Sequence, residues 1–289
     1  MSSALPQIFD RPLIARHLAR RPPDADDFIT ASVLADLEDR LGTVSRAFEQ
    51  ALIIGPDAAR LPTTGISAIG PFSFERASTL LPFGETPVLN PEALALPRDD
   101  YDLIVSLFDL QVVNDVPGML ARIRAHLRPD GLFLAAALGG DSLTELRQAF
   151  LAADVALSGG AYARVAPFIP LSDAGGLLQR AGFALPVADA ETMTVRYGSA
   201  LALMRELKAL GASNPLADRP NRLATRGLIA AAAAAYEAEA ADPDARVRAT
   251  LQIVWLAGWA PHDSQQKPLR RGSATVSLKD VLGTSDPAD

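Results

Sequence analysis

The residues of this chain that could carry chemistry follow short apolar runs, where glycine, proline, amide and carboxylate side chains come together. Four such places are Gly55-Pro56-Asp57, Gly70-Pro71-Phe72, Asn90-Pro91-Glu92 and residues 109–115. Glycine lets a ligand approach the backbone closely, and amide or carboxylate oxygens accept hydrogen bonds from ligand hydroxyls and amines. If the apolar runs are parallel strands, all four places meet at the carboxyl edge of one sheet, where α/β proteins bind ligands.

Composition and spacing exclude several other kinds of site. The chain has no cysteine, which rules out disulfides, thiolate nucleophiles and cysteine-ligated metals. His17, His126 and His262 have no metal-ligand spacing, and the sequence has no Ser-His-Asp arrangement or phosphate loop. A net charge of -7, with acidic and basic residues interspersed, argues against a nucleic-acid partner.

A strand–helix–strand unit in residues 101–138 must position the last of the four places. Leu103 to Phe108 is a nearly continuous apolar run, as expected of a strand buried on both faces. An apolar stripe at helical spacing then runs from Val116 to Leu127, and Pro129-Asp130-Gly131 ends the helix, with Gly131 suited to positive φ. Leu132 to Leu138 resumes a buried strand, and a crossover of this length implies that the two strands are parallel.

The remaining pattern extends this unit into an α/β protein with a doubly wound, mostly parallel sheet. We predict three parts: an N-terminal helical extension at 1–45, a sheet domain at 46–260 with helical insertions, and a polar tail at 261–289. Further strands are predicted at 51–54, 66–69, 87–89, 183–185, 193–197 and 250–256, and helices within 1–25 and at 26–41, 142–157, 171–181, 199–210 and 223–241.

Membrane and targeting signals are weak in this sequence. No apolar run approaches the roughly 20 residues needed to span a bilayer, and the start lacks the apolar segment of a secretory signal. We therefore expect a cytoplasmic protein without a transmembrane segment. Residues 11–21 are rich in arginine like a mitochondrial targeting helix, but Asp10 disfavours that interpretation.

Whole segments resemble the class I S-adenosylmethionine-dependent methyltransferases. Ile8 to Arg11, residues 107–136, Gly139 to Arg147 and Gln252 to Trp259 look like one subgroup, and the resemblance extends to about residue 260. This subgroup contains the methyltransferase-like complex I assembly factor that hydroxylates an arginine in a respiratory-chain subunit, and it is similar to the malonyl-acyl-carrier-protein methyltransferase. The resemblance implies a seven-stranded Rossmann-like sheet, S-adenosylmethionine as cofactor, and a protein or acyl-carrier substrate.

The cofactor motifs of the family are degenerate here. Only Gly55 remains of the glycine-rich loop that receives the methionine part of the cofactor, and it is followed by a proline. The ten residues from Pro56 to Gly65 are too few for the helix usual in the family. Asn90 replaces the third-strand aspartate that would contact adenine in the family. Gly70 stands where the family has an acidic residue that holds the ribose. The resemblance assigns cofactor contacts to Gly55, Gly70, Asn90, Glu92 and Phe108.

The sequence assigns no catalytic residue; the candidates are Gln111, Asp141 and Arg147. Gln111 stands where the subgroup has histidine. Asp141, Glu145 and Arg147 are compatible with two interpretations, which are a helix cap followed by a solvent-exposed helix face and a part of a pocket. The first hypothesis is a methyltransferase with altered cofactor binding. The alternatives are a catalytically silent protein that binds a client, such as a respiratory-chain subunit, and a protein arginine hydroxylase.

Overall fold

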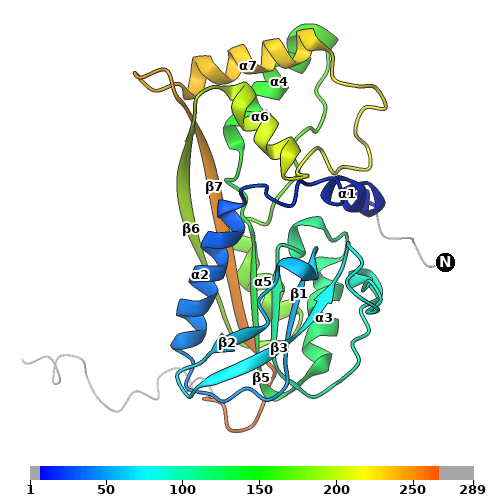
Figure 1. Ribbon diagram of the computed structural model, residues 1–289, viewed down its shortest axis with the longest axis vertical. Coiled ribbons are helices and arrows are strands. Elements are labelled where there is room, and N and C mark those ends of the chain that lie inside the picture. The colour runs from blue at the N-terminus through cyan, green and yellow to red at the C-terminus, as the bar shows by residue number, and fades with distance from the viewer. Residues whose placement is uncertain (1–6, 267–289) are drawn as a thin grey trace, which may run out of the picture.

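The computed structural model describes residues 7–266, which fold around one seven-stranded sheet (Figure 1). The strand order is β2-β3-β1-β4-β5-β7-β6. β3, β1, β4 and β5 are mutually parallel, β7 is antiparallel to β5, and β6 is antiparallel to β7, so only β2 and β7 run against the rest. The strands are β1 Ala51–Gly55, β2 Thr64–Ile66, β3 Pro71–Ser78, β4 Tyr101–Leu107, β5 Leu127–Leu138, β6 Ala184–Tyr197 and β7 Val247–Trp259. The predicted mostly parallel, seven-stranded sheet is confirmed.

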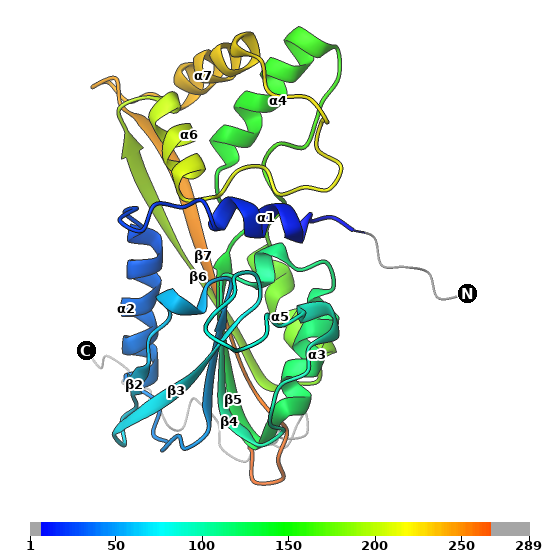
Figure 2. The same ribbon diagram turned by 45° about the vertical axis from the view of Figure 1, so that its right-hand side comes forward.

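Helices cover both faces of the sheet (Figures 1 and 2). α2 packs on one face through its apolar stripe of Val33, Leu37 and Leu41, and α3 and α5 pack on the other. Within residues 7–266 no helix is long and apolar enough to cross a bilayer. The helices are α1 Arg11–Leu18, α2 Phe28–Gly42, α3 Val116–His126, α4 Thr144–Ser158, α5 Leu171–Arg180, α6 Ala200–Ala209 and α7 Arg226–Ala240, with short 3-10 helices η1 Ala58–Arg60, η2 Pro91–Ala93 and η3 Leu110–Val112.

The two longest strands, β6 and β7, extend beyond the rest of the sheet and carry a second group of helices. α4, α6 and α7 share an apolar cluster with this extension, centred on Leu203, Tyr236 and Val247. Figure 2 shows α1 lying across the carboxyl edge, between the sheet and this upper helical group. The space under α1 is therefore bounded by both parts of the fold.

The β4-α3-β5 unit forms as its periodicity predicts. β4 is buried along its whole length, and Asp115 caps α3 by accepting a hydrogen bond from the Gly118 N–H at 2.9 Å. The predicted Pro129-Asp130-Gly131 turn lies within β5, since α3 already ends at His126, and Asp130 rather than Gly131 has positive φ, at 64°. Glycine is favoured at 131 for a different reason: a Cβ there would lie 3.0 Å from the carbonyl oxygens of Arg128 and Tyr101.

Two predicted short strands are wrong. Residues 66–69 were expected to form the strand that precedes Gly70, but Ile66 and Ile69 are 65% and 62% exposed, and the parallel neighbour of β1 is β3, Pro71–Ser78. Phe72 and Phe74 alternate with exposed residues there, as a half-buried strand requires. Residues 87–89 form no strand, since the chain instead approaches η2.

Two of the predicted strands are joined in the structure. The predicted strands at 183–185 and 193–197 are one continuous strand, β6, because its long antiparallel ladder with β7 bridges the polar residues between them. No α-helix follows β1, as the short spacing predicts, and η1 with β2 takes its place. The predicted polar tail lies largely outside the described residues, since only 261–266 are included.

Candidate functional site

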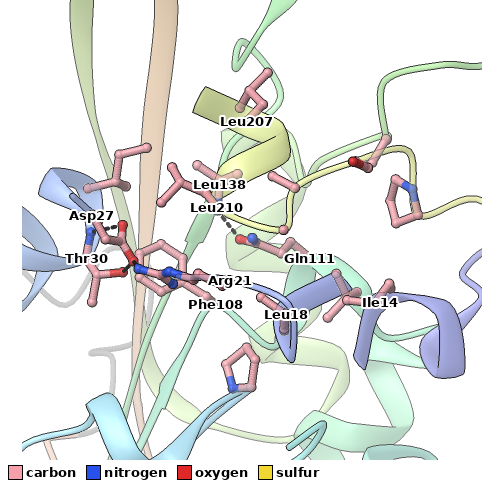
Figure 3. A pocket seen from close by; sticks show the side chains of 18 of the residues that line it. Ile14, Leu18, Arg21, Asp27, Thr30, Phe108, Gln111, Leu138, Leu207 and Leu210 are labelled. Carbon is pink, nitrogen blue, oxygen red and sulfur yellow. Dashed lines mark hydrogen bonds and ion pairs between the residues drawn. The ribbon is translucent and has the colours of Figure 1, made fainter. Parts of the chain in front are cut away.

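A cavity of about 270 Å³ lies at the carboxyl edge of the sheet, beneath α1 (Figure 3). Its walls come from α1, α2 and α6 and from the ends of β1, β4 and β5. We call it the edge cavity. Most of its lining is apolar: Ile14, Leu18, Ile29, Pro56, Leu61, Leu80, Leu107, Phe108, Val112, Leu138, Leu143, Leu146, Val165, Ala166, Phe168, Leu207, Leu210, Ala212, Pro215 and Leu251. A mainly apolar cavity with few polar groups is the usual form of a small-molecule site.

The polar groups of the edge cavity are few and specifically held. Gln111 accepts a hydrogen bond from the Leu138 N–H through Oε1 at 2.7 Å. Asp27 caps α2 by accepting from the N–H and the hydroxyl of Thr30 at 3.1 and 2.6 Å, and its Oδ2 lies 2.5 Å from Nη2 of Arg21. Burial opposes ionisation of Asp27, but these hydrogen bonds outweigh it and lower its pKa. A charged pair therefore stands in this wall, which Asp57, Arg60 and Arg164 also line.

Two residues that line the edge cavity have left-handed backbone. Phe108, directly after β4, has φ of 61°, and Leu143, directly before α4, has φ of 54°. This conformation costs about 1–3 kcal/mol for a residue with a side chain, and such strain is concentrated at functional sites. The Phe108 N–H donates to the Ala136 carbonyl at 2.8 Å, which fixes the turn.

The gap between the ends of β1 and β3 is closed. The Thr79 N–H donates to the Gly55 carbonyl at 3.0 Å, the Leu81 N–H to the Pro56 carbonyl at 3.0 Å, and the Ser78 hydroxyl to the same Pro56 carbonyl at 2.9 Å. Backbone groups that would face a ligand are thus paired with one another.

A buried carboxyl lies at the end of β4. Asp109 is fully buried, its Oδ1 accepts a hydrogen bond from the Thr79 hydroxyl, and its Oδ2 has no partner among the described residues. Arg11, on α1, donates to the Val112 and Thr79 carbonyls at 2.9 and 2.8 Å. Burial raises the pKa of Asp109 to about 7, although Thr79 and Arg11 act in the opposite direction. Arg11 thereby links the segments that follow β3 and β4.

Comparison with known proteins decides the family. No family model matches this chain. The chain is 36% identical over 294 residues to the arginine-hydroxylase NDUFAF5 of Rattus norvegicus, and this match covers 96% of this chain and 85% of the relative. It is 34% identical over 267 residues to the NDUFAF5 of Danio rerio, and this match covers 88% of this chain and 82% of that relative. The chain belongs to the NDUFAF5 family. As a member of that family it is a class I methyltransferase-like protein.

The chain also has a more partial likeness to acyl-carrier methyltransferases. The chain is 39% identical over 172 residues to a malonyl-[acyl-carrier protein] O-methyltransferase of Xylella fastidiosa, covering 59% of this chain and 56% of the relative. Among solved structures, phosphoethanolamine N-methyltransferase 2 of Haemonchus contortus with S-adenosyl-L-methionine aligns over 80% of this chain and 53% of that chain, with 13% identity and a TM-score of 0.44.

The cofactor position expected from the methyltransferase resemblance is filled in this NDUFAF5 relative. In front of Gly55 stands Leu61, whose Cδ2 would lie 3.1 Å from a Cβ built at position 55, with the Leu107 carbonyl oxygen at 3.4 Å. The hydrogen bonds between Gly55-Pro56 and Ser78-Thr79 close the adjacent gap. Leu61 and the paired backbone therefore occupy the space directly in front of Gly55 in this conformation.

The other predicted cofactor residues are scattered. Gly70 lies in the turn between β2 and β3, at the amino end of β3, so its expected position at the carboxyl edge is wrong. Asn90 is exposed and caps η2, accepting from the Glu92 N–H at 3.1 Å. Glu92 accepts from the backbone and side-chain nitrogens of Asn114, whose Oδ1 holds the Ile8 and Phe9 N–H groups. Glu92 thus fastens the N-terminal segment, and of the five residues only Phe108 lines the edge cavity.

Of the weak catalytic candidates only Gln111 lines the edge cavity. Asp141 is exposed and accepts from the Gln252 side chain at 2.9 Å, while Arg147 donates to the Ser142 and Ala166 carbonyls at 3.4 Å each. The predicted side-chain cap of α4 is wrong, because the N-cap is Leu143.

Glu145, which the sequence associated with the helix cap, instead accepts from the N–H and hydroxyl of Thr250, which ties α4 to β7. No group of three or more histidines or carboxylates suited to a metal occurs among residues 7–266.

Sequence reasoning missed the polar residues that matter most for the closed edge. Thr79 was overlooked because β3 was placed too early, although the alternation of Phe72 and Phe74 with polar residues was a readable signal. Arg11 belongs to a matched segment, but its partners lie 68 and 101 residues away. No local pattern indicates such contacts.

Proposed function

We propose that this protein is a methyltransferase-fold assembly factor of the NDUFAF5 type, which binds a group of a client molecule in the edge cavity without holding S-adenosylmethionine between β1 and β3. In this proposal the client is a protein such as a respiratory-chain subunit. The observation that carries it lies at the carboxyl edge. The space directly in front of Gly55 is filled by Leu61, and the backbone after β1 and β3 is hydrogen-bonded, while the edge cavity, which Leu61 also lines, stays open beneath α1.

Calorimetric and thermal titration with S-adenosylmethionine and S-adenosylhomocysteine tests this proposal. We expect no heat of binding and no rise in melting temperature at millimolar ligand. If the cofactor bound with a dissociation constant near ~10 µM, about 1 mM ligand would stabilise the fold by about 2.7 kcal/mol, which both methods detect easily. Micromolar binding by the unmodified chain would overturn the proposal.

The variant Leu61→Ala provides a matched second arm. It removes the side chain in front of Gly55 but leaves the hydrogen bonds of Ser78 and Thr79 in place. If Leu61 is the main obstacle, this variant gains cofactor binding that the parent chain lacks. If neither chain binds, the paired backbone also closes the gap, and the proposal stands.

Methyl transfer and arginine hydroxylation are the second candidates, favoured by the activities for which the 36% and 39% identical relatives are named. Either reaction would act on a client group seated beside Gln111 and Phe108, and the chain's own residues would bind and orient that group. Mass spectrometry of a co-expressed respiratory-chain subunit distinguishes the outcomes. A gain of one methylene indicates methyl transfer, a gain of one oxygen indicates hydroxylation, and an unchanged but co-purifying subunit supports the binding function.

A further inference from the structure

The arginine-rich stretch at 11–21 forms α1, and one side of this helix faces the edge cavity. We propose that the opposite side of α1, together with the segment that connects α6 to α7, binds an acidic segment of the client protein. This inference rests on the proposed function, because it places a second contact with the same client beside the edge cavity.

Helical periodicity gives α1 two different faces. Ile14 and Leu18, one turn apart, line the edge cavity. Arg16 follows Ile14 by two residues, which at about 3.6 residues per turn places it on the opposite face. Arg20 lies one turn after Arg16, and both side chains are exposed. Neither guanidinium has a hydrogen-bond or ion-pair partner within residues 7–266.

The segment between α6 and α7 brings further arginines to the same helix. The Asp10 N–H donates to the Pro215 carbonyl at 2.9 Å, which holds this segment beside the start of α1 (Figure 2). Arg219 pairs with Asp10 at 3.0 Å, and Arg222, three residues later, is exposed. We call the four arginines of the two segments the basic patch: Arg16, Arg20, Arg219 and Arg222.

The arginines on the two segments act on one place, the ring of His17. Burial lowers the pKa of this ring, and the charges of Arg20, Arg16 and Arg219 lower it further. Asp10 acts in the opposite direction. The positive charges of α1 and of the segment after α6 therefore add together on this side of the molecule. Because the ordinary pKa of histidine is 6.5, His17 is neutral at about pH 7 and contributes no charge of its own.

Acidic residues leave most of the basic patch unpaired. Arg219 is neutralised by Asp10. Asp24, Asp26 and Asp218 are the exposed carboxylates nearest along the chain, and none of them forms an ion pair with an arginine of the patch. The other three guanidinium groups are thus available to an anionic partner. This surface differs in sign from the chain as a whole, which has a net charge of -7.

A short carboxylate-rich protein segment fits the basic patch better than an extended polyanion does. A guanidinium can donate two parallel hydrogen bonds to one carboxylate. Leu223, which directly follows Arg222, is 93% exposed and offers an apolar side chain of the client a contact beside its carboxylates. A bilayer surface or a nucleic acid would extend past the patch and meet the excess of acidic residues on the rest of the chain.

Fluorescence anisotropy with a labelled octaglutamate peptide and the full chain at about pH 7.5 tests the proposal. We expect the peptide to bind at about 20 mM salt and to lose at least about tenfold in affinity by about 200 mM salt, because salt screens exposed charges. A glycine-serine peptide of the same length should not bind. The net charge alone predicts repulsion of octaglutamate, so absence of binding at low salt would refute the inference.

A pair of double variants separates the basic patch from the overall charge. Arg16→Glu/Arg20→Glu should lower the affinity for octaglutamate at least about tenfold. Arg180→Glu/Arg205→Glu changes the net charge equally at exposed arginines of α5 and α6, and it should lower the affinity by less than about threefold. Equal losses in the two variants would overturn the assignment. If the first variant does not fold, Arg222→Glu, in an exposed connection, supplies the same comparison.

Co-sedimentation with lipid vesicles distinguishes a membrane from a protein partner. Vesicles of phosphatidylcholine with about 30% phosphatidylglycerol present a surface of the same charge sign as the peptide. We expect no co-sedimentation at the salt concentration at which octaglutamate binds. Vesicle binding that is tighter than peptide binding and is lost in Arg16→Glu/Arg20→Glu would identify a membrane as the partner and overturn the proposal.

The result is separable from the cofactor experiment. Binding of S-adenosylmethionine would overturn the proposed function whatever the acidic peptide does. Failure of octaglutamate to bind, together with silence toward the cofactor, would remove the acidic docking segment and leave binding of a client group in the edge cavity intact.

Discussion

Replacing Asp109 by asparagine should change how stability depends on pH, because this carboxyl is fully buried with one oxygen unpaired. In the folded chain its pKa is raised to about 7 by burial, against an ordinary value of 3.8. Below about pH 4 the group is protonated in both the folded and the unfolded chain. Between about pH 4 and 7 the unfolded chain releases the proton while the folded chain retains it, so the fold loses stability as pH rises.

The size of this loss follows from the shift. A rise of about 3 pKa units at about 1.36 kcal/mol each amounts to about 4 kcal/mol by about pH 8. An asparagine side chain cannot ionise, so the variant Asp109→Asn should escape this loss. Any fixed cost of placing an amide in the same position is independent of pH. The free energy of unfolding of the variant minus that of the parent should therefore increase by about 4 kcal/mol from about pH 4 to about pH 8.

Urea unfolding followed by the fluorescence of Trp255 and Trp259 measures both free energies across this range. All other titrating groups are common to the two chains, so their contributions cancel in the difference. Thr79→Val removes a hydrogen bond that favours the ionised form, and it should move the pH at which the loss is complete to a higher value. A difference between parent and Asp109→Asn that stays constant across the whole pH range would refute the burial argument.

Two further predictions concern stability. Gly211 has φ of 80°, and a Cβ there would lie 3.1 Å from the backbone of α1. Gly211→Ala should therefore lower the free energy of unfolding by about 1–3 kcal/mol in urea denaturation. Gly160 has open space around it, so Gly160→Ala should change the free energy of unfolding by less than about 0.5 kcal/mol. Arg164→Met leaves the fully buried Asp154 without its partner and should lower the free energy of unfolding by about 3–5 kcal/mol. Arg219→Met breaks a partly exposed pair with Asp10 and should lower it by at most about 1 kcal/mol. Equal losses for the two variants would contradict the role assigned to burial.

The sequence by itself determines the elements whose signals are local. The β4-α3-β5 unit follows from nearly continuous apolar runs, as in strands buried on both faces, and from the ~3.6-residue period of the helix between them. The absence of a helix after β1 follows from the short spacing between Pro56 and Gly65. The resemblance over whole segments identifies the subgroup to which the relatives in fact belong. Such signals survive because each depends on residues that are near one another in the chain.

Tertiary structure alone decides the state of the carboxyl edge. Gly55 looks like the remnant of a cofactor loop, but Leu61 and the hydrogen bonds from Ser78 and Thr79 determine that the space in front of it is filled. Asp109 looks like a loop carboxylate, and only its burial raises its pKa. These properties depend on desolvation and on contacts between residues far apart in the chain, such as Arg11 with Val112, and chain packing in three dimensions is what sets both.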